Sequence, residues 1–189
     1  MRFSMNIRPA RASDAEAIRA MYNDAVATTT ATMDTQPRTP EQQAEWMRSH
    51  DGNPYPVIVA EDGSGRLLGF AALSPFNPRP GYTPTAEVSV YVHRDWRGHG
   101  VGKELMAALV EDAERRGFHA LVALISSGNA ASQRLHEHSG FAVAGTLPRV
   151  ARKFDTWIDV LIVQRNLHGA EAEPASEDDE DAPVAAATS

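Results

Sequence analysis

The 189-residue chain contains no cysteine. It can therefore form no disulfide, no thiolate metal site and no covalent cysteine intermediate. It also lacks any apolar run close to the about 18 residues that a membrane span needs, and its first residues lack the hydrophobic region of a signal peptide. We accordingly expect a cytoplasmic protein that makes no contact with a membrane.

The formal net charge of −7 arises at one end of the chain. Residues 169–189 hold seven acidic residues and no Lys or Arg, so residues 1–168 carry equal numbers of acidic and basic side chains. This end segment is rich in Ala, Pro, Glu and Asp without apolar periodicity, which predicts a disordered acidic tail that promotes solubility or binds a partner. The balanced remainder gives no sign of nucleic-acid binding.

Residues 5–167 are predicted to form one mixed α/β domain with the element order β-α-α-β-β-β-α-β-α-β-β. Hairpin signals and helical crossovers both occur, so we expect one central, mostly antiparallel mixed sheet flanked by helices. The expected strands are a short one at Ile7 and residues 55–61, 67–73, 86–93, 120–125, 141–147 and 157–167. The expected helices run from a capping box at Ser13–Glu16 to Ala27, from the N-cap Thr39 onward, over residues 101–113, and from Asn129 to near Ser139.

A glycine-rich turn, Arg97-Gly98-His99-Gly100-Val101-Gly102, separates the 86–93 strand from the 101–113 helix. A turn of this kind directs free backbone N–H groups and the positive end of the helix dipole to one place, which suits an anion such as a pyrophosphate. The alternative is an ordinary turn that starts a helix. Two common glycine-rich nucleotide motifs do not fit this turn. One requires Gly at position 97 and Ser or Thr at 104, where Arg97 and Glu104 stand, and the other requires Gly at 103 or 105, where Lys103 and Leu105 stand.

Several motifs together carry a family resemblance. They are the R-x-x-G-x-G turn, the strand Thr85–His93 before it, the loop Arg79-Pro80-Gly81-Tyr82, the stretch Asn129–Phe141 and the segment Lys153–Val160. In this order, and over about Met5 to Leu167, the chain resembles the GNAT acetyltransferase superfamily. Within that superfamily it is most similar to the phosphinothricin and methionine sulfoximine N-acetyltransferases.

The resemblance implies acetyl-CoA as co-substrate and no metal. It implies that the pantetheine arm pairs with the backbone of Val90, Tyr91 and Val92, that Asn129 bonds the pantetheine amide, and that Ser132 lies near the cofactor. For Asn129 and Ser132 the alternative is capping of a helix N-terminus. The pyrophosphate would be held by the N–H groups of Arg97, Gly98, His99, Gly100, Val101 and Gly102. The resemblance also implies a homodimer.

Amide formation needs an uncharged amine, so a base is useful. Glu87 is the candidate base because it is one residue out of phase with the apolar set Ala86, Val88 and Val90, and thus faces the other side of the sheet; alternatively it is a solvent-facing strand carboxylate. By resemblance, His136 would protonate the leaving thiolate, or it is a surface or core histidine that fixes its helix. A metal site at His136 and His138 is disfavoured, because residues two apart on a helix do not face each other.

The substrate would be a small amine. Arg79 and Tyr82, with Gly81 in the same loop, could hold an anionic group, since a guanidinium binds carboxylate or phosphinate with two hydrogen bonds. Lys153 would add positive charge, and residues 28–39 would cover the pocket. Arg79 could also be a solvated loop arginine.

The leading hypothesis is therefore an enzyme that acetylates the α-amine of a small anionic amino acid or analogue, by direct transfer in a ternary complex. One alternative is acetylation of another amine, such as a protein N-terminus. The other is a module that binds acyl-CoA without chemistry.

Overall fold

Seven strands form one sheet in the order β1-β2-β3-β4-β5-β7-β6. The computed structural model describes residues 5–51 and 54–167, and the predicted acidic tail, residues 169–189, lies outside them. The strands are β1 (Met5–Pro9), β2 (Val57–Asp62), β3 (Leu67–Pro75), β4 (Thr85–Val92), β5 (Ala120–Ser126), β6 (Ala142–Lys153) and β7 (Thr156–Asn166). The helices are α1 (Ala15–Thr28), α2 (Pro40–His50), α3 (Val101–Arg115) and α4 (Ala130–His138), with short 3₁₀ turns at Ala12–Asp14, Pro80–Tyr82 and Arg94–Trp96.

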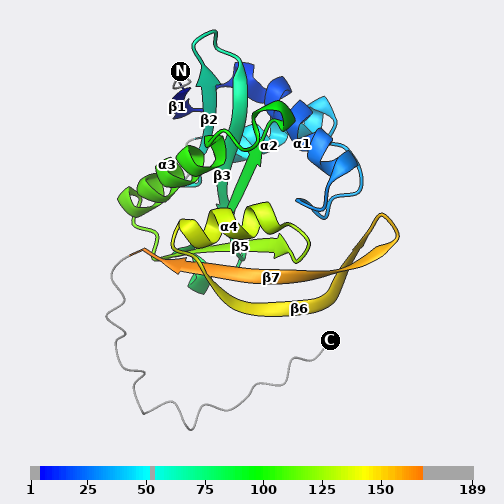
Figure 1. The fold of residues 1–189 in the computed structure, drawn as a ribbon. Helices are drawn as coiled ribbons and strands as arrows, with labels where there is room; N and C mark the ends of the chain where they lie inside the picture. The colour runs from blue at the N-terminus through cyan, green and yellow to red at the C-terminus, as the bar shows by residue number, and fades with distance from the viewer. Residues whose placement is uncertain (1–4, 52–53, 168–189) are drawn as a thin grey trace.

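The sheet divides between β4 and β5. All other neighbours pair antiparallel, while β4 and β5 pair in parallel over three residues only, ending at Glu87 and Val122. Beyond Glu87, β4 continues to Val92 with β3 as its one strand partner among the described residues. Figure 1 shows the result: β1–β4 stand upright above β5, β7 and β6, which lie across the base of the molecule. A fork thus opens between the two halves of the sheet.

The two faces of the β1–β4 half carry separate cores. Leu105 and Leu109 of α3 are fully buried against one face, on which Ala86 and Val88 of β4 point inward. The opposite face packs against α1 and includes Phe70 of β3. Because strand side chains alternate between faces, Glu87, Ser89 and Tyr91 share the α1 side. The predicted period-2 pattern of this strand is confirmed.

The predicted order of helices and strands is confirmed, and one predicted cap is wrong. The chain does not start α1 with a capping box at Ser13; instead it first makes the 3₁₀ turn Ala12–Asp14. The Asp14 carboxylate accepts hydrogen bonds from two donors. The guanidinium of Arg8 in β1 donates to both of its oxygens, at 2.7 and 3.0 Å, and the backbone N–H of Arg11 donates at 2.7 Å. A paired, charge-assisted contact of this kind outweighs a local cap.

The second predicted cap is confirmed. Gln42 donates its N–H to the Thr39 hydroxyl at 3.2 Å, and the Thr39 N–H donates to the Gln42 side chain at 2.9 Å. The predicted strand at residues 141–147 proves longer, since β6 runs to Lys153 beside β7 after an irregularity between Leu147 and Ala151. Within the described part of the chain, no helix is long and apolar enough to cross a membrane.

Candidate active site

The glycine-rich turn has the backbone that its sequence predicted. Gly98 and Gly100 have φ of +77° and +85°, in the left-handed region that other residues rarely adopt, and Gly100 is the N-cap of α3. Residues 97–100 are exposed. The backbone N–H groups of residues 98–103 donate to no other residue in the part of the chain that the structure describes. Unpaired donors at a helix N-terminus are the arrangement that binds phosphate groups.

The open edge of β4 leads directly to this turn. Val90, Tyr91 and Val92 pair with β3 on one side, and on the other side they face the fork rather than β5. An unpaired strand edge can accept an extended, amide-containing chain as an added strand. The edge and the turn together therefore fit a molecule with an amide arm and a diphosphate, as coenzyme A has. Acetyl-CoA bound there would supply the acetyl group as a thioester.

At the start of α4, the capping alternative for Asn129 is observed. Its side-chain oxygen accepts the N–H of Ser132 at 3.1 Å. This bond leaves the amide nitrogen of Asn129 available to a ligand. Ser132 is half-buried, with its hydroxyl 3.4 Å from Nδ1 of His136.

Glu87 lies where the fork opens. It forms the last parallel pair of β4 with β5, and its half-buried side chain is on the α1 side of the sheet. Desolvation raises the pKa of this carboxyl above its ordinary value, and no charged neighbour among the described residues contributes to that pKa. A desolvated carboxylate without a charged partner is a stronger base than a solvated one.

His136 is 4% exposed and packs edge-to-face against Phe141, with ring centroids 5.1 Å apart. Nδ1 lies 2.8 Å from the carbonyl oxygen of Ser132, so this nitrogen carries the proton and donates it. The opposite nitrogen, Nε2, is buried and has no partner among the described residues. Desolvation lowers the pKa of the ring. These features are those of the core-histidine alternative.

The α1–α2 loop, residues 29–39, is held across the mouth of the fork. The Tyr22 hydroxyl of α1 donates to Asp34 at 2.5 Å, and the hydroxyls of Thr30 and Ser126 lie 2.9 Å apart. Lys153 is 4% exposed and donates to the carbonyl oxygen of Thr32 at 2.7 Å. The loop is therefore tied both to α1 and to the strand ends of the β5–β7 half.

Sequence analysis missed the anchors Tyr22 and Ser126. Tyr22 reads as one more apolar position of a helix, and Ser126 lies 96 residues away from its partner Thr30. No local pattern signals contacts of that kind.

The predicted substrate loop lies at the surface. Arg79, Gly81 and Tyr82 are exposed around the 3₁₀ turn Pro80–Tyr82, and Tyr82 meets Phe76 edge-to-face. Among the contacts that the structure shows for the described residues, none joins this loop to Lys153. Their substrate roles remain predictions. Among the described residues, no group of three His, Asp or Glu side chains is placed as metal ligands are.

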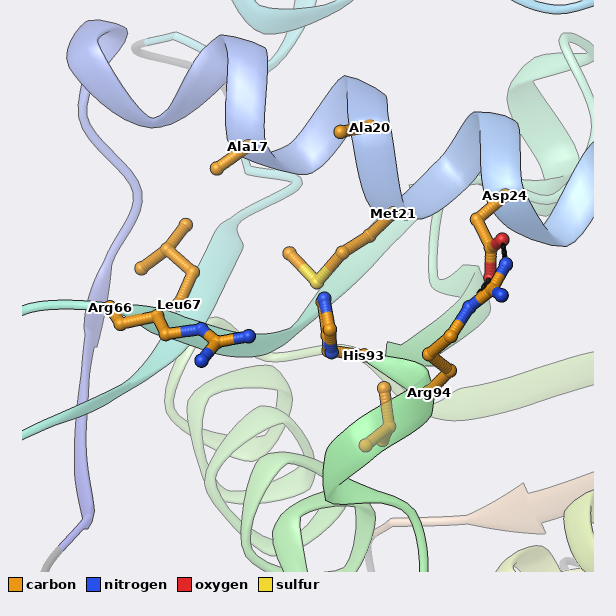
Figure 2. A pocket seen from close by; sticks show the side chains of 9 residues that line it. Ala17, Ala20, Met21, Asp24, Arg66, Leu67, His93 and Arg94 are labelled. Carbon is orange, nitrogen blue, oxygen red and sulfur yellow. Dashed lines mark hydrogen bonds and ion pairs between the residues drawn. The ribbon is translucent and has the colours of Figure 1, made fainter.

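A cavity of about 320 Å³ lies between α1 and the adjoining ends of β3 and β4 (Figure 2). Its lining is mostly apolar, from Ala17, Ala20 and Met21 of α1, and of the predicted site residues only Val92 contributes to it. At its edge Asp24 forms an ion pair with Arg94, and Figure 2 shows the two side chains end to end. The cavity therefore lies beside α1 at the end of β4, and neither Glu87 nor the glycine-rich turn lines it.

Known proteins resemble the chain over most of its length. Residues 4–142 match the family model described as acetyltransferase (GNAT) domain. An L-methionine sulfoximine/L-methionine sulfone acetyltransferase from Pseudomonas aeruginosa is 41% identical over 171 residues, which cover 90% of this chain and 99% of that protein.

Solved structures agree. A GNAT superfamily phosphinothricin acetyltransferase from Sinorhizobium meliloti, in complex with acetyl-CoA, superposes with a TM-score of 0.86 at 31% identity, covering 92% of this chain and 94% of that one. A ribosomal-protein-alanine N-acetyltransferase from Brucella melitensis gives a TM-score of 0.83 at 41% identity, covering 86% and 99%. By the family match over residues 4–142 and the 41% identity over 90% of its length, the chain belongs to the GNAT family and is an acetyl-CoA-dependent acetyltransferase.

Proposed function

We propose that the enzyme acetylates the α-amine of a small anionic amino acid or analogue, of the methionine sulfoximine, methionine sulfone or phosphinothricin type. The observation that carries the proposal is the position of Glu87: a desolvated carboxyl without a charged partner at the opening of the fork, on the strand that leads to the glycine-rich turn. Relatives named for these substrates add support, since their likeness extends over nine tenths of the chain.

Each part of the site then has one task. The N–H groups of residues 98–102 hold the diphosphate of acetyl-CoA, and the backbone of Val90, Tyr91 and Val92 pairs with its pantetheine arm. The N–H of Arg97, which the sequence also assigned to the diphosphate, already donates to the carbonyl oxygen of Arg94 at 3.5 Å. Asn129 bonds the pantetheine amide through its free nitrogen, close to Ser132. These contacts fix the thioester in the fork next to Glu87, which removes the entropic cost of bringing the two reactants together.

Glu87 takes the proton that the amine must lose. An ammonium whose pKa is two units above the ambient pH costs ~2.7 kcal/mol to deprotonate, and a positioned carboxylate accepts that proton directly or through one water. Arg79, Gly81 and Tyr82 bind the anionic end of the substrate, and Lys153 holds the α1–α2 loop over it.

The acid role of His136 stays a prediction. It would require a second proton on a buried ring whose pKa burial lowers. The neutral ring already satisfies its one donor at Ser132.

A panel of amines tests the substrate. Release of CoA is measured at equal concentrations of methionine sulfoximine, methionine sulfone, phosphinothricin, neutral amino-acid amides and peptides that begin with alanine. We expect the highest kcat/KM with the three anionic analogues. Preference for the peptides would overturn the proposal and would favour the activity in the name of the Brucella melitensis neighbour.

Homodimer formation and a cytoplasmic location stay predictions. The dimer is supported by exposed apolar side chains on the β6–β7 hairpin, where Val143, Val150 and Trp157 are each more than half exposed. Sedimentation velocity at several protein concentrations measures the oligomeric state directly.

A further inference from the structure

The side chain of Arg97 reaches back to the open edge of β4. Its Nε donates to the carbonyl oxygen of Val92 at 3.3 Å. The N–H of His93, in the same peptide group as that oxygen, donates to the carbonyl oxygen of Leu68 in β3 at 2.8 Å. Because the N–H and C=O of a trans peptide group point in opposite directions, the Val92 carbonyl points away from β3 and into the fork. Arg97 thus binds a carbonyl that an added strand would use.

A half-buried carboxylate of α1, that of Asp24, pairs with the same guanidinium. Nη2 of Arg97 lies 4.0 Å from Oδ2 of Asp24. The same carboxylate forms an ion pair with Arg94, whose Nε donates to it at 3.3 Å (Figure 2). Arg94 and Arg97 flank the 3₁₀ turn that leads from β4 into the glycine-rich turn. Asp24 therefore joins α1 to both ends of this connection.

Coenzyme A carries a competitor for each contact of the Arg97 side chain. The pantetheine arm has amide N–H groups, which need strand carbonyls such as that of Val92. The diphosphate is an anion that a guanidinium binds with two parallel hydrogen bonds. An exposed ion pair at 4.0 Å, such as that of Arg97 with Asp24, is a weaker contact than such a paired one. Arg97 can therefore exchange its present partners for the cofactor.

We propose that Asp24 is a positioning residue that sets the affinity for acetyl-CoA through Arg97. It holds the guanidinium over the Val92 carbonyl, and acetyl-CoA displaces the guanidinium from there as the pantetheine arm pairs along β4. The released side chain then turns to the diphosphate, beside the N–H groups of residues 98–102. The inference rests on the proposed placement of acetyl-CoA along β4 and the glycine-rich turn.

The direction of the effect follows from the competition between two anions for one cation. Asp24→Asn keeps the shape of the side chain and removes the charge that competes with the diphosphate for Arg97. We expect the Kd of acetyl-CoA to fall about two- to fivefold, the range that an exposed ion pair contributes. The KM of the amine at saturating acetyl-CoA should stay unchanged, because the effect acts at the cofactor.

The test is isothermal titration of the protein with acetyl-CoA, without an amine, so that the result depends neither on Glu87 nor on the identity of the amine. Asp24→Glu restores the charge and should restore the Kd. Asp112→Asn is the matched control and should leave the Kd unchanged. Asp112 is a half-buried helix acid that also pairs with two arginines, Arg115 at 3.1 Å and Arg116 at 2.8 Å, near the end of α3 opposite the glycine-rich turn.

A double-mutant cycle shows whether Asp24 acts through Arg97. In an Arg97→Gln background, Asp24→Asn should tighten acetyl-CoA binding no further, because coupled residues are not additive. Tightening that persists in this background would overturn the inference, since Asp24 would then act by its own charge alone. The Nε–H signal of Arg97 in nitrogen NMR, assigned by its loss in Arg97→Gln, should also shift when acetyl-CoA binds.

A glycine variant separates this inference from the proposed placement of the cofactor. Gly100 has φ of +85°, so Gly100→Ala strains the turn and should weaken acetyl-CoA binding. An unchanged Kd in Gly100→Ala would remove the placement, and the inference with it. Weakened binding in Gly100→Ala together with an unchanged Kd in Asp24→Asn would overturn the inference alone.

Discussion

At the scale of single residues, the chemistry depends on how burial changes the affinity of a group for a proton. Glu87 is half-buried and desolvation raises its pKa above the ordinary 4.5 of glutamate. A base acts as the carboxylate, so activity is lost as the pH falls through this raised pKa. We expect the acidic limb of kcat/KM at a higher pH than for a solvated glutamate, and a loss of 10²- to 10⁴-fold in Glu87→Gln.

Stopped-assay measurements of CoA release between pH 5 and 9 check both expectations. Glu111→Gln, at an exposed position of α3, is the matched control and should keep the profile of the unchanged enzyme. If the acidic limb of kcat/KM survived in Glu87→Gln, another group would be the one that accepts the proton from the amine.

His136 illustrates the opposite shift. Burial lowers its pKa, so the ring takes up a second proton less readily than a solvated histidine does, and it contacts Ser132 and Phe141. We expect His136→Gln to lower Tm because the edge-to-face contact with Phe141 is lost, an effect of about 1 kcal/mol beyond the area it buries. The alkaline side of the pH profile should be unchanged. Loss of that side, with an unchanged Tm, would instead assign His136 the acid role.

At the scale of elements, local pattern predicted most of what forms. Alternation placed Glu87 on the face opposite Val88, and Thr39 with Gln42 marked the start of α2. These features depend on neighbours a few residues apart. The cap at Ser13 was predicted wrongly because Arg8, on another element, takes up Asp14.

Long-range contacts account for the rest. The fork depends on how soon β4 and β5 separate, and the partners of the α1–α2 loop lie up to 121 residues away along the chain. The hydrophobic periodicity of the sequence predicts neither the fork nor the partners of this loop. For the same reason the contact between the His50 ring of α2 and the Leu73 carbonyl of β3 has no local signal in the sequence.

Lys153 shows how one long-range contact changes the role expected of a residue at the end of a strand. The sequence suggested that it binds the anionic substrate, whereas in the structure its ammonium donates to Thr32 of the α1–α2 loop and its pKa is lowered, chiefly by desolvation. We expect Lys153→Met to loosen the loop and to raise KM for the amine about tenfold, a typical effect of losing a hydrogen bond to a charged group. The increase should be equal for anionic and neutral amines, with KM for acetyl-CoA unchanged.

Steady-state kinetics with one anionic and one neutral amine measure the difference. Arg152→Met provides the comparison, since this neighbouring cation is exposed and pairs with Asp155 in the hairpin. A penalty confined to the anionic amine would mean that Lys153 touches the substrate charge itself.

At the scale of the whole molecule, the proposed reaction brings two substrates together between the two halves of the sheet. The open edge of β4 and the glycine-rich turn lie on one side of the fork, and the α1–α2 loop covers the other, with Glu87 between them. The chain has no cysteine, so no acetyl-cysteine can carry the group from one substrate to the next. Direct transfer therefore requires both substrates to be bound together.

The kinetic consequence is an intersecting pattern. When acetyl-CoA is varied at several fixed amine concentrations, reciprocal plots should cross, because each substrate changes the apparent affinity or the rate for the other. The protein incubated with radiolabelled acetyl-CoA alone should retain no label after denaturation, since holding both substrates in one fork removes the need for a covalent carrier. Parallel plots together with retained label would place the acetyl group on a residue of the enzyme, and direct transfer across the fork would then be wrong.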